Sequence, residues 1–484
     1  MNNVHLPPGW AKATIAEVCG FQRGVTYRKS QARPSPAVRH LPLLRATNIG
    51  ETQLLLDEPL LFVPEELVSL EQRLRAGDIV VATSSGSVQV VGKSARLANE
   101  WEGTFGAFCA VVRTGPEADS SYVGYFLQSA DIRKVWSNAA RGTNINNLKR
   151  SDVQRTHIPL PPLPEQRRIV AEIEKQLTRL DAAVGGLERA RAGLRRYRAS
   201  VLHAAVEGRL VPTEASLARA EGREFESASQ QLSQLGISTL VDVSPTTEGW
   251  AACELGRLAR VETGATPLRS RPEYYGGDIP WVTSGALNLP FVDAAQEHIT
   301  ELAIRETNAK IFPPGTMLVA MYGEGKTRGK SAEMRIAAAT NQACAAVLFN
   351  DATQPMKPYV QQFLRKHYDD LRRQSAGGVQ PNLNLSIVRS IVIPVPPTAE
   401  QHRIVAEVER RLSIAEKLEA AVADGLRRAT ALRRSILKRA FEGRLVPQDP
   451  DDEPAEVLLE RIRAERAAQA SDGRTPRRRR RARA

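Results

Sequence analysis

Two loops of the chain carry residue types that can bind phosphate. Gly92-Lys93-Ser94 and Gly329-Lys330-Ser331 are each followed by an alanine, and each lies in a loop after a predicted strand. Glycine amides and a lysine ammonium can together surround an anion, but a nucleotide-binding P-loop also needs a glycine five positions before the Gly-Lys pair. Those positions hold Ser87 and Glu324. The spacing argues against nucleotide binding and favours basic loops that contact a nucleic-acid backbone.

Other catalytic signatures are missing from the sequence. An adenine methyltransferase needs Asn or Asp before a Pro-Pro pair, and none of the Pro-Pro pairs, which begin at Pro7, Pro161, Pro313 and Pro396, is preceded by either. The four cysteines form no C-x-x-C pair, and the seven histidines show no metal-ligand spacing. We therefore expect no catalytic residue and no metal site in this chain.

Polar side chains on loops beside the strands remain as candidates for DNA contacts. Amide and guanidinium groups make bidentate contacts with adenine and guanine edges. In the first half we predict DNA binding by Arg45, Asn48, Thr83, Ser84, Gln89, Lys93, Arg141, Asn144 and Asn147. In the second half we predict DNA binding by Thr283, Ser284, Tyr322, Lys326, Arg328, Lys330, Gln380 and Asn382. For any single residue, surface polarity or turn capping is an equally good explanation.

Two globular regions must position these side chains, one over residues 1–157 and one over 248–392. Short apolar runs bounded by glycine and proline predict strands at 41–44, 79–82, 88–91 and 107–112, and an amphipathic helix at 122–136. The second region predicts strands at 279–282, 317–321 and 343–349 and a helix at 357–368. Each is a mixed domain of helices and strands.

A doubled segment follows each globular region. Ile-Pro-x-Pro-Pro-x-x-Glu-Gln begins at Ile158 and again at Ile393, and Glu-Gly-Arg-Leu-Val-Pro closes both copies, from Glu207 and from Glu442. The copies span 158–212 and 393–447, which makes the repeat a whole domain-sized unit. The sequence thus predicts approximate internal two-fold symmetry.

Each copy predicts one long helix that forms a coiled coil. An acidic residue, Glu165 or Glu400, stands near the start, and Gly208 or Gly443 stands at the far end as a cap. At about 1.5 Å per residue, such a helix would be roughly 65 Å long. Apolar steps of three and four predict a seam with three-residue slips. The predicted seam residues are Ile173, Leu177, Leu180, Leu187, Leu194, Val408, Leu412, Leu418, Val422 and Leu432.

Composition sets the broad class of the protein. The chain has 484 residues, is 42% hydrophobic, and has no leading apolar run or long apolar stretch, so we expect a cytoplasmic protein. Seven of the last eleven residues are arginines, which account for much of the formal charge of +13. We expect a linker with a short helix at 213–247, and a C-terminal helix followed by a disordered arginine-rich tail at 448–484.

The doubled motif, its order and the long helices closely resemble the specificity subunit of type I restriction-modification systems. The resemblance implies an α+β (mixed) fold with two α/β target recognition domains and a long antiparallel two-helix coiled coil. Each domain would read one half of a bipartite, asymmetric site on double-stranded DNA. Two readers on one face of a duplex must be spaced by about one helical turn, roughly 34 Å, or by a multiple of it.

The resemblance also implies the partners and their cofactors. Two modification subunits would use S-adenosylmethionine to methylate adenine N6, and two restriction subunits would use ATP and Mg, in defence against foreign DNA. This chain would bind no cofactor itself. Gly185-Gly186 within the first helix and the terminal arginine run depart from the family pattern.

Two alternatives remain open on sequence grounds. One is an assembly scaffold whose domains no longer read DNA, and the other is a stand-alone nuclease or methyltransferase. Sequence-independent binding by the reconstituted complex would favour the scaffold. Methylation by the purified chain alone would favour the enzyme.

Overall fold

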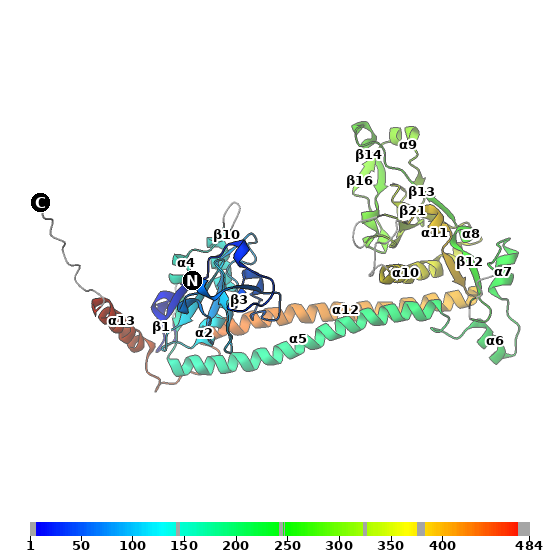
Figure 1. Ribbon diagram of the computed structural model, residues 1–484. Helices are drawn as coiled ribbons and strands as arrows, with labels where there is room; N and C mark the ends of the chain where they lie inside the picture. Colours follow the sequence, from blue (N-terminus) through cyan, green and yellow to red (C-terminus); the bar gives the residue numbers. More distant parts are fainter. Residues whose placement is uncertain are drawn as a thin grey trace. The chain divides into compact units, whose positions relative to one another are not determined.

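The computed structural model describes residues 6–141, 146–241, 245, 247–322, 327–374 and 383–472. The chain divides into two compact units, Met1–Leu187 with Asp424–Ala484, and Glu188–Ala423. Each unit contains one globular domain and parts of both long helices, because the boundaries fall within those helices (Figure 1).

The two larger sheets of the first globular domain have four and three strands. The four-stranded sheet has the order β2-β9-β5-β7, and the three-stranded sheet has the order β4-β3-β8. Their bounds are β2 Cys19–Arg23, β9 Cys109–Thr114, β5 Ile79–Ala82, β7 Ser94–Arg96, β4 Leu61–Pro64, β3 His40–Leu44 and β8 Thr104–Phe105. All pairings are antiparallel except β3 with β8. Strand β5 is buried on both faces, which explains its four consecutive apolar residues.

The second globular domain repeats this plan with added edge strands. Its sheets have the orders β13-β21-β18-β19-β15 and β16-β14-β20-β17. Their bounds are β13 Arg260–Thr263, β21 Cys344–Leu348, β18 Met317–Ala320, β19 Ser331–Met334, β15 Phe291–Val292, β16 Glu297–Ile299, β14 Tyr275–Val282, β20 Ala338–Thr340 and β17 Ile311–Phe312. The parallel pair β14–β20 corresponds to β3–β8. The mixed fold class is thereby confirmed in both domains.

One glycine in each domain permits a close crossing of two backbones. A Cβ on Gly24 would lie 2.1 Å from the carbonyl oxygen of Gly106. A Cβ on Gly264 would lie 1.8 Å from the carbonyl oxygen of Thr340. Any side chain at these positions would collide with backbone, so only glycine allows the two segments to approach.

Two predicted elements of the first domain are wrong. Residues 88–91 form turns because the N–H groups of Val90 and Val91 both donate to the Ser87 carbonyl, and Gly92 then takes a φ of +80°. The single helix predicted at 122–136 is two helices, α2 (Ser120–Gln128) and α3 (Ala130–Ala139). The break is at Ser129, whose ψ of 145° is extended rather than helical.

The long helices are α5 (Leu163–Val206) and α12 (Thr398–Phe441), each of 44 residues. Both end in the same glycine cap. Gly208 and Gly443 have φ values of +69° and +68°, and the next residue donates back into the last turn, from Arg209 to Ala204 and from Arg444 to Arg439. This is the geometry of a Schellman cap, so the predicted role of both glycines is confirmed. Gly185 and Gly186 lie inside α5 without ending it.

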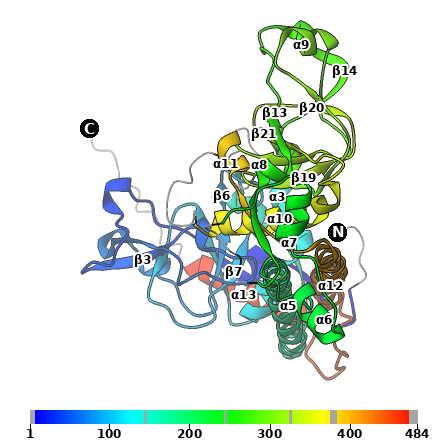
Figure 2. The same ribbon diagram turned by 90° about the vertical axis from the view of Figure 1, so that its right-hand side faces the viewer.

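The two helices pair antiparallel within each unit. In the first unit Arg433 bonds to Asp181 at 2.6 Å, and Gly425 leaves room for Leu187. In the second unit Arg198 bonds to Glu419 at 3.2 Å. Figures 1 and 2 both show α5 and α12 side by side. The antiparallel coiled coil expected from the sequence is therefore present.

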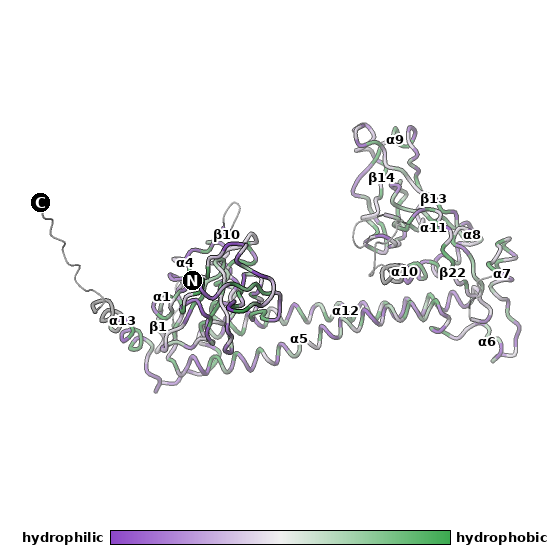
Figure 3. Tube along the Cα trace, viewed as in Figure 1, coloured by the Kyte–Doolittle hydropathy of each residue, from purple (hydrophilic) through white to green (hydrophobic). Residues whose placement is uncertain are grey.

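The seam of the coiled coil has no slips. On α12, steps of four and three alternate without interruption through Val408, Leu412, Ala415, Glu419, Val422, Leu426, Ala429, Arg433 and Ile436, and all are buried or half-buried. On α5 the steps of four and three run through Ile173, Leu177, Leu180, Val184 and Leu187 and, in the same register, through Leu194, Arg198 and Val201. The seam position between these two runs, Arg191, is exposed. The alternation of polar and apolar residues along both helices is visible in Figure 3. This is an ordinary heptad pattern with charged residues at some seam positions.

Leu418 and Leu432 lie outside this seam. They are 49% and 52% exposed. Their neighbours Glu419 and Arg433 occupy the seam positions of the heptad and form ion pairs with residues of α5. On α12, a seam that includes these two leucines requires the three-residue slips predicted from the sequence. A cross-helix ion pair satisfies a charged seam residue, so the heptad continues and the leucines face outward.

Two leucines of α12 test this assignment. Leu412 is 8% exposed and Leu418 is 49% exposed. We expect Leu412→Ala to lower the free energy of unfolding by about 2–5 kcal/mol, because it leaves a cavity in the seam. Leu418→Ala should change it by no more than about 0.5 kcal/mol. Denaturant unfolding followed by helical circular dichroism measures both, and equal losses would reject the continuous heptad.

The doubled motifs join each domain to its helix. Strand β1 (Ala11–Thr14) pairs with β11 (His157–Leu160), and β12 (Ala251–Glu254) pairs with β22 (Val392–Val395). The Trp10 indole donates to the Glu165 carboxylate at 3.0 Å, and the Trp250 indole donates to Glu400 at 2.9 Å. The tryptophan that precedes the first strand of each domain thus forms the same buried hydrogen bond with the glutamate of the Glu-Gln motif in both units.

A helix of each domain lies on the coiled coil. In the first unit α2 packs against α5 and the end of α12 through Tyr122, Phe126 and Phe441. In the second unit α10 (Lys357–Gln374) packs against α12 and the end of α5 through Tyr359 and Phe363. The hydroxyl groups of Tyr122 and Tyr359 each donate at 2.7 Å to a proline carbonyl of the strand that leads into the long helix. The helices are therefore part of each domain's core.

The segments after the long helices dock in matching ways. The 213–247 segment contains two short helices, α6 (Glu214–Glu221) and α7 (Ala228–Gln234), rather than one. Ala228 donates to the Gly249 carbonyl, and Ala455 at the start of α13 (Ala455–Asp472) donates to the Gly9 carbonyl. Arg403 pairs with Glu214 at 2.7 Å, and Arg168 pairs with Asp452 at 2.6 Å. The C-terminal helix thus holds the first domain as the linker holds the second.

Candidate nucleic-acid interface

Both Gly-Lys-Ser motifs lie on the return side of a β-hairpin. In the first domain the hairpin joins β5 to β7, and in the second it joins β18 to β19. Gly92 and Gly329 have φ values of +80° and +81° and donate to Ala82 and Ala320. The N–H of that same alanine, Ala82 or Ala320, donates to the carbonyl of the lysine that follows the glycine. A P-loop leads from a strand into a helix, so this geometry differs from a nucleotide site.

The first hairpin brings together predicted residues that are far apart in the sequence. Strand β6 (Ser84–Ser85) pairs with β10 (Asn146–Asn147), and the Ser84 hydroxyl donates to the Asn147 amide oxygen at 2.7 Å. The N–H of Leu148 donates to the Thr83 carbonyl at 2.8 Å. Asn147 is exposed, Ser84 is half-buried and Thr83 is buried. Hydroxyl and amide groups therefore gather at the tip of one hairpin.

The segments that follow β3 and β14 hold the next predicted residues. The amide oxygen of Asn48 accepts from the Arg45 N–H at 3.0 Å, and Asn48 is buried. Asn48 therefore caps a turn, and its side chain is not available at the surface. The Arg45 guanidinium donates to the Pro59 carbonyl at 3.3 Å. Thr283 and Ser284 occupy the corresponding turn after β14 and are half-buried.

The remaining predicted DNA-binding residues fall into two groups. Gln89, Arg141 and Tyr322 are exposed, and Arg328 is half-buried. Asn144, Lys326, Gln380 and Asn382 lie outside the described residues.

Three residues beside the two hairpins were not predicted. Glu51 accepts from Lys93 at 2.7 Å and also pairs with Arg133 of α3. Arg133 in turn donates to the Gln89 carbonyl at 2.9 Å. Burial acts to raise the pKa of Glu51, but the bonds from Lys93 and Arg133 outweigh it and hold that pKa below its ordinary value. In the second domain Lys330 donates to the Asn288 amide oxygen at 2.7 Å. Neither Glu51 nor Asn288 belongs to a motif, so only the fold reveals them.

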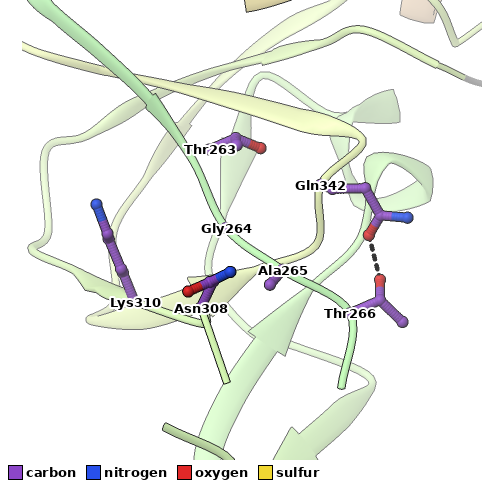
Figure 4. Close-up of a pocket in the computed structure, with 7 residues that line it drawn as sticks. All are labelled: Thr263, Gly264, Ala265, Thr266, Asn308, Lys310 and Gln342. Atoms are coloured by element: carbon purple, nitrogen blue, oxygen red, sulfur yellow. Dashed lines mark hydrogen bonds between the residues drawn. The ribbon is translucent and has the colours of Figure 1, made fainter. Parts of the chain in front are cut away.

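A shallow depression of about 540 Å³ lies in the second domain beside the glycine crossing (Figure 4). Several of its polar side chains already have partners. The Thr266 hydroxyl donates to the Gln342 amide oxygen, Lys310 donates to Glu262 at 3.1 Å, and the Thr263 hydroxyl donates to the Cys344 carbonyl. None of the predicted DNA-binding residues lines it.

The described part of the chain contains no group of three or more His, Cys, Asp or Glu side chains that could hold a metal ion. The four cysteines are buried, and burial raises the pKa of Cys109 and of Cys344 to about 12. A thiol with such a pKa is protonated at neutral pH and a poor nucleophile. No described helix is long and apolar enough to span a membrane.

A family model described as the type I restriction modification DNA specificity domain matches the chain twice, over residues 7–183 and 247–421. Each match covers one globular domain and the first part of the long helix that follows it. The two matches thus repeat the division that is seen in the sheets and in the doubled motifs.

Characterised proteins resemble the chain along almost its whole length. The EcoKI specificity subunit of Escherichia coli K12 is 31% identical over 482 residues, which cover 96% of this chain and 97% of that protein. The StySPI specificity subunit of Salmonella potsdam is 30% identical, with 96% and 97% covered.

Two solved structures share the fold. A chain from a study of complex assembly and conformational transition of the type I R-M system matches with a TM-score of 0.67 at 20% identity. That match covers 91% of this chain and all of the other. The HsdS subunit of Thermoanaerobacter tengcongensis matches with a TM-score of 0.52 at 20% identity, covering 92% and 99%.

Proposed function

The chain belongs to the family of type I restriction modification DNA specificity domains, and we propose that it is the DNA-recognition subunit of a type I restriction-modification complex. Each globular domain reads one half of a bipartite, asymmetric site. The observation that carries this proposal is that the family model matches once on each domain. Two copies of one scaffold with different loops are suited to reading two different sequences.

We assign the direct contacts with base edges to the polar side chains at the hairpin tips. In the first domain Ser84 and Asn147 present hydroxyl and amide groups that are bonded to each other at 2.7 Å. Such groups can exchange a bond within the protein for bonds to a base edge in the major groove. The exposed Gln89 and Arg141 lie in the same loops and supply further contacts to bases or phosphates.

We assign the covalent chemistry on DNA to partner proteins. We assign adenine N6 methylation to two modification subunits that use S-adenosylmethionine, and ATP-dependent restriction to two restriction subunits that use Mg, all acting in the cytoplasm. The paired helices set the spacing between the half-sites and dock the modification subunits. Ile414 and Leu418 support a docking role, because they are exposed one helical turn apart on α12.

Reconstitution tests this function. The chain is combined with the modification subunit of a type I system from the same host, and methylated adenines are mapped across a genome. A single bipartite sequence with an unspecified spacer is the expected result. Methylation without sequence preference would favour a scaffold, and methylation by the chain alone would favour an enzyme.

Asn147→Ala tests the assignment of the first domain. A bidentate side-chain contact is worth about 1–3 kcal/mol of base discrimination, or roughly 5–150-fold. We expect the reconstituted complex to lose discrimination by this factor at one position of one half-site, while the other half-site is read as before. Asn138→Ala on α3 is the matched control, because Asn138 is exposed outside the hairpin. Unchanged discrimination in Asn147→Ala would remove this residue from the interface.

A further inference from the structure

The two Gly-Lys-Ser lysines make the same kind of contact in the two domains. Lys93 donates to Glu51 at 2.7 Å, and Lys330 donates to the Asn288 amide oxygen at 2.7 Å. Glu51 and Asn288 lie in equivalent places, on the segments that follow β3 and β14. The contact is therefore kept although the acceptor changes from a carboxylate to an amide.

The backbone around both lysines is held in one geometry. Each lysine N–H donates to a residue three positions earlier, Lys93 to Val90 at 3.1 Å and Lys330 to Thr327 at 3.0 Å. Each lysine carbonyl accepts from the last residue of the outgoing strand, Ala82 or Ala320. The backbone of the lysine is thus fixed at the base of the hairpin, and its side chain extends to the neighbouring segment.

Further contacts strengthen this connection in the first domain. Glu51 also pairs with Arg133, and Arg133 donates to the Gln89 carbonyl in the hairpin loop at 2.9 Å. The Lys93 side chain is only 20% exposed, so much of it is covered by protein. A lysine that serves mainly to hold a phosphate would keep its ammonium open to the solvent rather than in a carboxylate pair.

We propose that Lys93 and Lys330 are positioning residues that clamp the hairpin loop to the segment after β3 or β14, and that they do not bind the DNA backbone. The two segments held by each clamp carry the candidate base-reading residues, such as Ser84 and Arg45, or Tyr322 and Ser284. Sequence reading requires these groups to keep fixed relative positions. The inference rests on the proposed function for its purpose, but the clamp itself exists without DNA.

The two roles predict opposite results in the first domain. If Lys93 is a clamp, Lys93→Met and Glu51→Ala remove the same bond, because neither methionine nor alanine can form it. Each should then weaken binding of the reconstituted complex to its target by a similar factor, about 3–30-fold, and the double variant should be no weaker than the worse single variant. The slope of log affinity against log salt should stay unchanged.

If Lys93 bound a phosphate, its loss would reduce that slope by about 0.9, the contribution of one released counterion. Glu51→Ala would then strengthen binding, because it removes a negative charge beside DNA. That pair of results would overturn the proposal. Lys134→Met is the matched control for the loss of charge, since Lys134 is an exposed residue of α3 outside the clamp. Lys330→Met and Asn288→Ala repeat the comparison in the second domain.

Hydrogen exchange of the full chain without DNA separates the clamp from the proposed function. Amides of residues 84–92 should exchange faster in Lys93→Met and in Glu51→Ala than in the wild type and in Lys134→Met. Unchanged exchange would reject the clamp whatever the complex binds. Faster exchange, with a wild-type complex that shows no sequence preference, would keep the clamp and reject the proposed function.

Discussion

Replacing Phe441 by alanine is expected to lower the free energy of unfolding of the first compact unit by about 3–5 kcal/mol. Phe441 is the last residue of α12, is 8% exposed, and lies edge-on to Tyr122 and Phe126 with ring centroids 5.5 and 5.3 Å away. Edge-to-face pairs contribute roughly 0.5–1.5 kcal/mol beyond the area that they bury. The substitution therefore removes both a large core side chain and two aromatic contacts that hold α2 on the coiled coil.

Hydrogen exchange of the full chain measures this effect in each unit separately. Amides of α2 should lose protection in Phe441→Ala, while amides of α10 in the second unit should keep theirs. Phe108→Ala is the control, because Phe108 is 63% exposed and should change stability by at most about 0.5 kcal/mol. Equal effects of the two substitutions would show that Phe441 does not hold the first domain to α12.

The doubled segment made much of the fold predictable. Identical motifs at both ends of each copy indicated two equal helices, and the two helices have the same length and the same glycine cap. The reason is local, because a glycine with positive φ ends a helix whatever surrounds it. Position 441 shows the limit of the repeat. Its counterpart at the end of α5 is Val206, so the aromatic contacts of the first unit could not be read from the second.

The predictions of the seam were wrong where a tertiary contact outweighs the local pattern of apolar residues in the sequence. Leu418 and Leu432 looked like seam residues because they are apolar, yet Glu419 and Arg433 fill the seam since each has an opposite charge across from it. Arg198 and Asp181, which supply those charges, are more than 200 residues away in sequence. No pattern within one helix can reveal such a partner.

The contacts within the candidate interface could not be predicted from the sequence for the same reason. Ser84 and Asn147 were chosen separately as polar loop residues, and only the pairing of β6 with β10 brings them into contact. Lys93 was chosen as a DNA-contacting cation, but its partner Glu51 lies in a segment with no recognisable motif. Loop residues carry weak local signals, because turn chemistry and binding favour the same polar side chains.

The buried carboxylates at the start of the long helices are the second strong test. Burial raises the pKa of Glu165 and of Glu400, against the opposing effect of their hydrogen bonds. A carboxyl group whose pKa is raised on folding binds its proton more tightly in the folded state. The stability it contributes is full below the ordinary pKa near 4.5 and is lost as pH rises through the folded value.

The two carboxylates differ in one hydrogen bond. In the second unit one oxygen of Glu400 accepts from the Trp250 indole, and the other accepts from the Glu214 N–H at 2.8 Å. In the first unit the Trp10 indole bonds to one oxygen of Glu165, while the other oxygen is buried without a hydrogen-bond partner. The same substitution should therefore have different consequences in the two units.

We expect Glu400→Gln to destabilise the second unit by about 1.5–3 kcal/mol at neutral pH, because an amide NH2 cannot accept from the Glu214 N–H. Glu165→Gln should be neutral or stabilising in the first unit, since its amide oxygen still accepts from Trp10 and no other bond is lost. Its advantage over wild type should grow as pH rises through the folded pKa of Glu165. Hydrogen exchange of α2 and α10 at several pH values measures both effects. Equal losses in the two variants would mean that the second oxygen of Glu165 has a partner after all.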